Sequence, residues 1–213
     1  VKNILITNDD GIYSAGLRAA CESVHGLGDL TVVAPSAQKS GVGRGISILQ
    51  PIRVLKVKLP HIHAKKFYSV DGTPTDAVIV GLYGIMAKKP NLFLSGFNIG
   101  ENLSTESVTT SGTIGAALEA ASNGVPTIAA SVQVKEQAEK FDTFSLKSGF
   151  SAPVEFIRRI AKTVLDDGMP DGVDMLNINF PNRTTKKTRV EITRLAKRVY
   201  RTSVQERRDP RGR

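Results

Sequence analysis

The sequence predicts an α/β fold built on a doubly wound, mostly parallel sheet. Two observations lead to this class. Short apolar runs rich in β-branched residues recur along the chain, as is typical of strands that are buried on both faces. Stretches with helical spacing of apolar residues separate these runs, so most strands are joined by helical crossovers and lie parallel. Such an alternation is typical of an open sheet of the Rossmann type.

The expected strands are the short apolar runs between turn signals. They span residues 3–7, 30–34, 46–59, 66–70, 91–96, 126–132 and 174–180, and TRVEITRL (188–195) lies beyond the last of them. The runs at 46–59 and 66–70 follow each other without a helix, so we expect a meander or hairpin there.

The expected helices carry recognisable start and stop signals. They span residues 14–27, 74–88, 114–125 and 148–167. Ser14 is the expected N-cap of the first helix. At the second helix, Thr73 is the expected N-cap, Pro74 occupies the first helical position, and Asp76 is expected to bond back to the cap. Gly124 is the expected stop of the third helix. Polar loops rich in Gly and Ser fill residues 35–45 and 97–113.

Composition places the chain among soluble globular proteins. It has 213 residues, of which 40% are hydrophobic. No apolar run reaches the roughly 20 residues that span a bilayer, and the N-terminus lacks the pattern of a secretory signal, so we expect a cytoplasmic protein without a membrane partner. The single Cys21 excludes an internal disulfide and is expected in the core. His25, His61 and His63 are not expected to bind a metal ion.

Charge divides the chain at about residue 182. Residues 183–213 contain twelve Lys or Arg against three Asp or Glu, which equals the net charge of +9 of the whole chain. We therefore predict a catalytic domain at 1–182 and a basic C-terminal extension at 183–213. A basic run can attract nucleic acid, but a solvated arm is the favoured interpretation, so nucleic acid is not the expected main partner.

Oxygen-bearing side chains follow three of the predicted strands. Asp9 and Asp10 come after the first strand, Ser40 after the second, and Asn98 or Asn102 after the strand at 91–96. In an open parallel sheet, these carboxyl-terminal loops share one edge, where ligands bind. Carboxylate, amide and hydroxyl oxygens suit Mg²⁺ or Mn²⁺, and a cation removes the repulsion between adjacent carboxylates. The alternative is an acidic pair that only caps loops and helices.

The loop before the third helix predicts an anion site. In TSGT (110–113), Ser111, Gly112 and Thr113 stand at a helix N-terminus, where backbone amides and the helix dipole favour a phosphate. A plain N-cap is the alternative interpretation of this stretch. A cation site and an anion site on the same sheet edge suggest a phosphate bound to a metal ion.

Other nucleotide and hydrolase motifs fit less well. GVGRG (41–45) is glycine-rich, but it follows the second strand rather than opening the first helix, where NDDGIYSAG stands. The Walker spacing and the GxSxG elbow do not occur in the sequence. A receiver domain needs an Asp where Ser95 and Gly96 end their strand.

Five ordered motifs carry a resemblance to a known family. ILITNDDGI, VVAPSAQKSGVG, VDGTPTDAV, LSGFNIGENL and SGTIGAALEA together closely resemble the SurE family of metal-dependent 5′-nucleotidases. The resemblance implies a Rossmann-like domain with a protruding β-hairpin region, a homodimer or homotetramer, and one Mg or Mn ion per subunit. It implies metal ligation by Asp9, Asp10, Ser40 and Asn98, and substrate phosphate near Asn102, Ser111, Gly112 and Thr113.

The chain departs from the family pattern in three places. Thr110 stands where the family usually has Tyr, Ser104 stands where it usually has a second Gly, and the family usually continues for several dozen residues beyond the last motif here. We therefore expect 183–213 to be the start of an oligomerisation segment.

The predicted reaction is hydrolysis of nucleoside 5′-monophosphates by in-line attack of water on phosphorus. Asp9 and Asp10 are the expected catalytic residues, and which of them touches the water is left open. Nucleoside 3′-monophosphates and polyphosphate are further candidate substrates. The alternatives are a nucleotide- or RNA-binding module without catalysis, and another metal-dependent transfer enzyme such as a glycosyltransferase.

Overall fold

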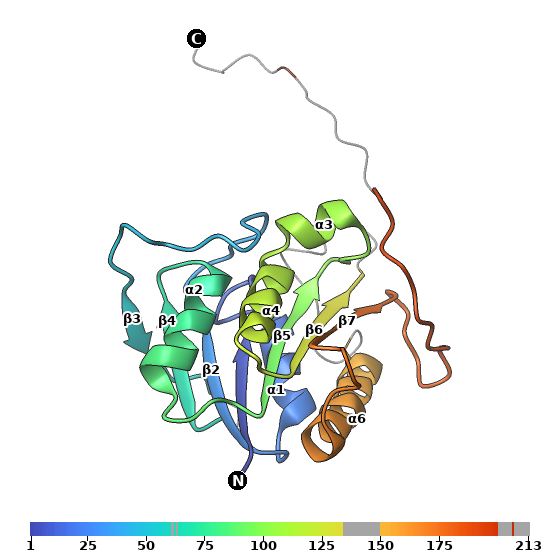
Figure 1. Ribbon diagram of the computed structural model, residues 1–213, viewed down its shortest axis with the longest axis horizontal. Helices are drawn as coiled ribbons and strands as arrows, with labels where there is room; N and C mark the ends of the chain where they lie inside the picture. Colours follow the sequence, from blue (N-terminus) through green and yellow to red (C-terminus); the bar gives the residue numbers. More distant parts are fainter. Residues whose placement is uncertain (61, 63, 134–149, 200–205, 207–213) are drawn as a thin grey trace.

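The computed structural model describes residues 1–60, 62, 64–133, 150–199 and 206. A seven-stranded sheet in the order β3-β4-β2-β1-β5-β6-β7 forms its centre (Figure 1). The strands are β1 Asn3–Thr7, β2 Asp29–Pro35, β3 Val54–Lys56, β4 Lys66–Val70, β5 Leu92–Ile99, β6 Thr127–Val132 and β7 Met175–Phe180. All neighbouring pairs are parallel except β3 with β4, so the predicted fold class is confirmed.

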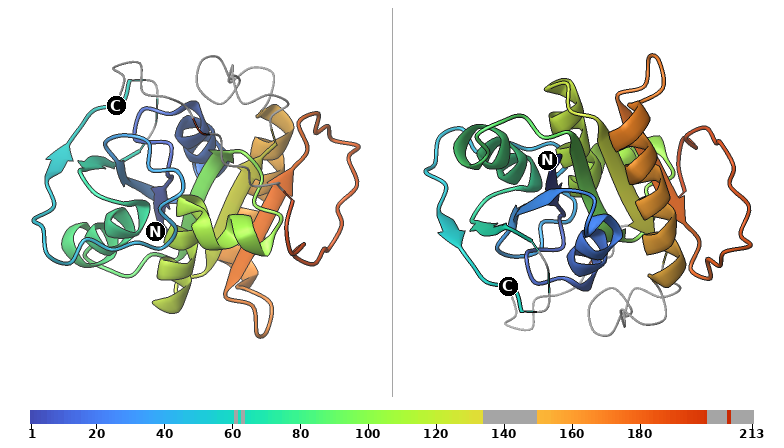
Figure 2. Two further views of the ribbon diagram at one scale, coloured as in Figure 1. Left: turned by 90° about the horizontal axis from the view of Figure 1, so that it is seen from above. Right: turned by 90° about the horizontal axis from the view of Figure 1, so that it is seen from below.

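Helices cover both faces of the sheet (Figures 1 and 2). They are α1 Ala15–Val24, α2 Pro74–Ile79, the π-helix η1 Val80–Ile85, α3 Thr105–Thr110, α4 Gly112–Ser122 and α6 Ser151–Asp167. Helices α1 and α6 pack together on one face, and α2 and α4 pack together on the other. Alternation along β1 serves both cores, since Ile4 and Ile6 face the first pair and Leu5 faces the second.

The topology reverses at β1. Strands β2 and β4 lie on one side of it, and β5, β6 and β7 lie on the other. This is a topological switch point, where the loops at the carboxyl ends of adjacent strands diverge and leave a crevice for a ligand. The Asp pair that follows β1 therefore stands at the place where such sheets bind ligands.

Two predicted elements are shorter than expected. The helix expected at 74–88 is α-helical only to Ile79 and then widens into η1, in which the Met86 amide donates to the Gly81 carbonyl at 3.0 Å. The strand expected at 46–59 is wrong over most of its length, because only β3 is formed. Pro51 cannot donate to a ladder, and Ile48 and Leu49 are exposed rather than buried.

Part of the stretch expected as a loop at 97–113 forms regular secondary structure. Strand β5 continues to Ile99, and α3 occupies Thr105–Thr110. Ser104 begins α3 through a capping box, in which its hydroxyl accepts from the Ser107 amide and the Ser107 hydroxyl accepts from the Ser104 amide. Helix α4 begins at Gly112, two residues earlier than expected.

The described part of the segment after β7 is mostly exposed and contains turns but no helix or strand. Residues 188–195 form no strand, and the described part of the segment joins the body by an isolated bridge between Ala196 and Ser104. Ala196 accepts from the Thr105 amide at 2.8 Å and donates to the Leu103 carbonyl at 3.0 Å. His61, His63 and the last residues of the basic extension lie outside the described residues. None of the described helices combines the length and apolar character that a membrane crossing requires.

Candidate active site

Asp9 is buried where β1 ends, and α4 holds it from the opposite side. The residue is only 3% exposed. The Thr113 hydroxyl in the first turn of α4 donates to Asp9 Oδ1 at 2.6 Å. Gly112 makes this approach possible, because a Cβ atom at that position would lie 2.8 Å from the Asp9 Cβ. The first strand end and the predicted anion-binding helix start are therefore in direct contact.

Asp10 is half-buried and lies beside the end of β5. Its Oδ2 accepts from the Ile99 amide at 3.4 Å. Asn98, the residue before Ile99, therefore lies close to Asp10 along the chain of β5. The Asn98 amide nitrogen donates to the Gly100 carbonyl at 2.6 Å. That bond uses the nitrogen, and the side-chain carbonyl oxygen is the atom that a hard cation would bind.

The loop after β2 lies against the Asp pair. The Lys39 amide donates to the Asp9 carbonyl at 2.7 Å, which brings the neighbouring Ser40 to the same edge. Ser40 is exposed, and its hydroxyl accepts from the Gln38 side chain at 3.1 Å. Gly11, with φ +99°, lets the chain turn away after the pair and passes close to the Ala37 backbone. Three predicted loops thus meet through bonds to Asp9, Asp10 or their neighbours.

Asn102 is held by the far strands instead. Its side chain donates to the Ser131 hydroxyl at 2.9 Å, and its amide donates to Asn179 Oδ1 at 2.7 Å. Its carbonyl accepts from Asn177 at 2.9 Å and from Asn179 at 3.3 Å. Sequence reasoning missed the two β7 asparagines, although their spacing of two residues in LNINF places them on the same face of the strand.

The helix start at 110–113 contains an N-cap residue and two backbone amides of the first turn. Ser111 is the N-cap of α4, and its hydroxyl accepts from the Ile114 amide at 3.2 Å, so the N-cap interpretation is confirmed for this residue. The amides of Gly112 and Thr113 belong to the first turn, where a helix has no internal acceptors for its N–H groups. An anion at this end would be favoured by these amides and by the helix dipole.

The two positions that depart from the family pattern have structural roles. Ser104 is fully buried as the cap of α3. Thr110 is exposed, and its hydroxyl donates to the Glu106 carbonyl one turn earlier at 3.0 Å. Neither hydroxyl bond reaches the Asp pair.

The donor set fits a hard divalent cation. Within the described parts of the chain, no three His, Cys, Asp or Glu side chains cluster closely enough to hold a metal ion. A site here would therefore combine the Asp9 and Asp10 carboxylates with neutral oxygens. Asp9 accepts a hydrogen bond from a hydroxyl and Asp10 accepts one from a backbone amide, and both carboxylates are oxygen ligands of the kind that hard cations prefer. This favours Mg²⁺ or Mn²⁺ over zinc, which prefers N and S ligands.

Cys21 takes no part in the site. It is buried in α1, and burial raises the pKa of its thiol to about 12. The thiol is therefore protonated at neutral pH, as expected for a core residue.

Comparisons with known proteins agree with these features. The family model described as "Survival protein SurE" matches residues 4–202. The chain is 54% identical to "5'-nucleotidase SurE" from Methanothrix thermoacetophila, covering 100% of this chain and 80% of the relative. It is 56% identical to the protein of the same name from Methanosarcina barkeri, covering 99% and 78%. The crystal structure of the Sure protein from Aquifex aeolicus superposes with a TM-score of 0.80 at 36% identity, covering 99% of this chain and 79% of that one.

Proposed function

Because the chain belongs to the SurE family, we propose that it is a metal-dependent 5′-nucleotidase, which hydrolyses nucleoside 5′-monophosphates to nucleoside and phosphate. The observation that carries this proposal is the bond from Thr113 to Asp9. It joins a carboxylate pair suited to a cation to a helix start suited to a phosphate. A phosphomonoester needs both, since its charge must be neutralised and its orientation fixed.

Asp9, Asp10, Ser40 and Asn98 would hold one Mg or Mn ion per subunit. Bound there, the ion would supply a counter-charge to the carboxylates and polarise a phosphate oxygen of the substrate. Support comes from the donor set and from the contacts of Asp9 and Asp10 with the loops that carry Asn98 and Ser40.

The protein's own groups bind and orient the substrate. The Gly112 and Thr113 amides and the Ser111 side of the helix start would receive the phosphate, and Asn102 would bind it from the β6 and β7 side. Thr113 keeps Asp9 in one orientation, because its hydroxyl donates to Oδ1. Asp10 is more exposed than Asp9, so it is the better placed carboxylate to accept the proton of the attacking water.

Phosphate release from AMP tests the proposal. We expect turnover with Mn²⁺ or Mg²⁺ and loss of turnover in EDTA. Asp9→Asn should reduce the rate by at least about a hundredfold. Phosphomonoester hydrolysis is among the slowest uncatalysed reactions, so the enzyme must lower its activation barrier by a large amount, and the loss of one metal ligand should be severe. Asp171→Asn is the matched control, because Asp171 is an exposed acid in a turn before β7. Full activity in EDTA, or in Asp9→Asn, would contradict the metal site.

Substrate range and the rival function need separate assays. A panel of 5′- and 3′-monophosphates and polyphosphate would establish which phosphates are hydrolysed. Binding of RNA that weakens steeply with salt, together with no turnover of any phosphomonoester, would favour the binding module. A cytoplasmic location stays a prediction.

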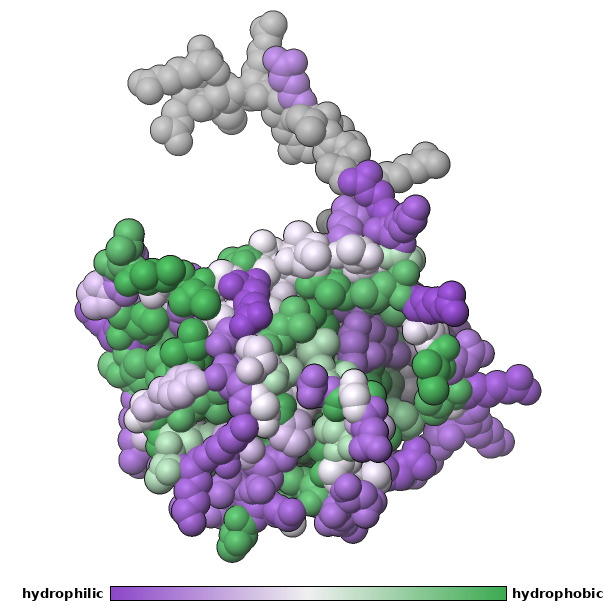
Figure 3. Space-filling model, in the orientation of Figure 1, coloured by the Kyte–Doolittle hydropathy of each residue, from purple (hydrophilic) through white to green (hydrophobic). Residues whose placement is uncertain are grey.

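We also propose a homodimer or homotetramer. Figure 3 shows apolar side chains gathered on the surface near β3. Ile48 is 84% exposed, Leu49 95% and Leu55 54%. Strand β3 is also the edge of the sheet, and an exposed apolar edge is a typical place for association between chains. Light scattering of the purified protein would give the mass of the assembly.

A further inference from the structure

We infer that Arg44 and Glu119 are positioning residues, which fix the loop of residues 36–47 and thereby hold Ser40 beside the carboxylate pair. This role depends on the proposed function, since Ser40 matters here as a ligand of the cation. Neither residue belongs to the proposed metal or phosphate site.

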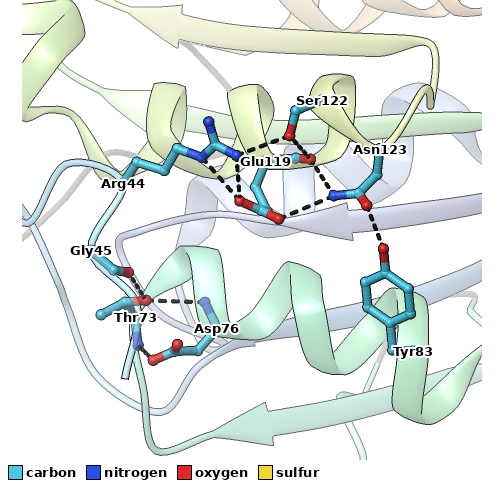
Figure 4. Close-up of polar contacts among 8 residues, drawn as sticks. All are labelled: Arg44, Gly45, Thr73, Asp76, Tyr83, Glu119, Ser122 and Asn123. Carbon is cyan, nitrogen blue, oxygen red and sulfur yellow. Dashed lines mark hydrogen bonds and ion pairs between the residues drawn. The ribbon is translucent and has the colours of Figure 1, made fainter. Parts of the chain in front are cut away.

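Arg44 forms a two-pronged ion pair with α4 (Figure 4). Its Nε and Nη2 donate to Glu119 Oε2 at 2.9 and 2.8 Å, and Nη2 also donates to the Ser122 hydroxyl at 2.9 Å. The Glu119 residue is only 8% exposed, and its Oε1 accepts from Asn123 at 3.0 Å. Two guanidinium nitrogens that donate to one carboxylate oxygen, together with the bond to Ser122, restrain Arg44 more than a single bond would. The ion pair therefore restrains the orientation of the loop on α4.

The loop backbone also lies directly on the helices. The Gly43 amide donates to the Thr110 carbonyl at 2.8 Å. A Cβ atom at Gly115 would lie 2.4 Å from the Gly43 carbonyl oxygen, so the loop touches the backbone of α4. Gly43 has φ +56° and would meet the Thr109 carbonyl if it carried a Cβ. These contacts leave no room for a side chain between the loop and the helix.

A second attachment follows Arg44 at the start of α2. The Thr73 hydroxyl donates to the Gly45 carbonyl at 2.7 Å, as Figure 4 shows. The Ser47 amide and hydroxyl donate to the two oxygens of Asp76 at 2.9 and 2.7 Å. Asp76 is 1% exposed and also completes the capping box of α2. The loop is thus bonded to both helices of this face.

Ser40 lies between two fixed points of the loop. Upstream, the Lys39 amide is bonded to the Asp9 carbonyl, and downstream the Gly43 amide is bonded to Thr110. The intervening residues 40–42 are exposed, so these flanking bonds hold them in place. Loss of the Arg44 ion pair would loosen the downstream point and leave Ser40 with a wider range of positions relative to Asp9.

Mn²⁺ binding by calorimetry tests this role without turnover. We expect Arg44→Ala to weaken Mn²⁺ binding roughly tenfold, at the lower end of the roughly 10- to 100-fold range seen when groups that orient metal ligands are removed. Arg44→Lys should recover only part of the loss, because an ammonium cannot reproduce the two-pronged bond. Lys65→Ala is the matched control, since it removes a 2.9 Å ion pair with Asp29 on the exposed surface. It should leave Mn²⁺ binding unchanged.

A double-mutant cycle separates positioning from general destabilisation. If Arg44 acts through Ser40, Arg44→Ala should cost almost nothing further in a Ser40→Ala background. Faster amide hydrogen exchange in residues 40–47 of metal-free Arg44→Ala is the second expected result. Glu119→Gln, which keeps the shape of the side chain, replaces Arg44→Ala in every assay if that variant does not fold.

Two outcomes would overturn the role. One is Mn²⁺ binding by Arg44→Ala, or by Glu119→Gln if that variant is used, within twofold of the parent. The other is a loss that is the same size with and without Ser40. A parent protein that neither binds Mn²⁺ nor hydrolyses AMP would instead reject the proposed function, so the two failures are distinguishable.

Discussion

Removal of the Thr113 hydroxyl tests the contact on which the site depends. The hydroxyl of buried Thr113 donates to Asp9 Oδ1 at 2.6 Å. Thr113→Val keeps the size and branching of the side chain but cannot donate this hydrogen bond. A hydrogen bond to a charged group contributes about 1.5–3 kcal/mol, and about 1.4 kcal/mol corresponds to a factor of ten. We therefore expect kcat/KM for AMP to fall about ten- to hundredfold.

The assay is steady-state phosphate release from AMP at saturating Mn²⁺, with Mn²⁺ affinity measured in parallel. Thr113→Ser is the control, because it keeps the hydroxyl and loses only a methyl group. It should retain activity within a few-fold of the parent. A Thr113→Val enzyme with kcat/KM within twofold of the parent would refute the view that this hydroxyl orients Asp9.

Three further predictions concern other parts of the molecule. Asn179→Ala removes the acceptor of a 2.7 Å bond that fixes the loop after β5, so KM for AMP should rise about tenfold while kcat changes less; an unchanged KM would count against this loop as a substrate contact. Gly112→Ala should weaken Mn²⁺ binding, because its Cβ would lie 2.8 Å from the Asp9 Cβ, whereas Gly84→Ala meets nothing within 4 Å and should bind as the parent does. The pKa of Cys21 is raised to about 12 in the folded state, so above about pH 9 the unfolded chain loses this proton first and stability falls with rising pH; urea unfolding of Cys21→Ala should lack that part of the fall.

The sheet was predictable because buried parallel strands leave a direct trace in the sequence. Strands covered on both faces, such as β1 and β2, must be apolar along most of their length, so the runs at 3–7 and 30–34 stand out. The run at 46–59 is also rich in aliphatic residues, but most of it is exposed, with Leu49 at 95%. Composition alone does not distinguish a buried run from an apolar surface segment, so the strand prediction was correct there only for β3, which pairs antiparallel with β4 as the predicted hairpin requires.

Helix α3 shows the opposite case. Its residues are Thr, Glu, Ser and Val, which give no apolar face to detect, and none of them is buried. The helix is defined instead by the Ser104 capping box and by contacts of its ends with Ala196 and Gly43. These partners come from distant parts of the chain, so helical periodicity could not reveal it.

The candidate site likewise has one part that could be predicted from the sequence and one part that could not. The rule that ligands bind at strand ends was enough to select Asp9 and Asp10, because it needs only the position of β1 in the sheet. The Thr113 contact could not be derived, since it joins residues 104 positions apart and depends on Gly112 having no side chain. The sequence shows that position 112 is a glycine, but only the fold shows that Asp9 packs against it.

Glycines lie where the chain segments of the site touch each other. Close backbone contacts at these glycines explain why the loops are held in place although they contain little regular secondary structure. Gly112 lets α4 approach Asp9, Gly115 lets the loop of residues 36–47 touch α4, and Gly11 lets the chain turn beside Ala37. At each contact a backbone meets a backbone or a short side chain, where distances vary less than between long side chains. Ion pairs such as Arg44 with Glu119 then act on loops that are already close to their final positions. Substitutions at the glycines should therefore displace the site as a whole, whereas loss of the ion pair should loosen only the loop that carries Ser40.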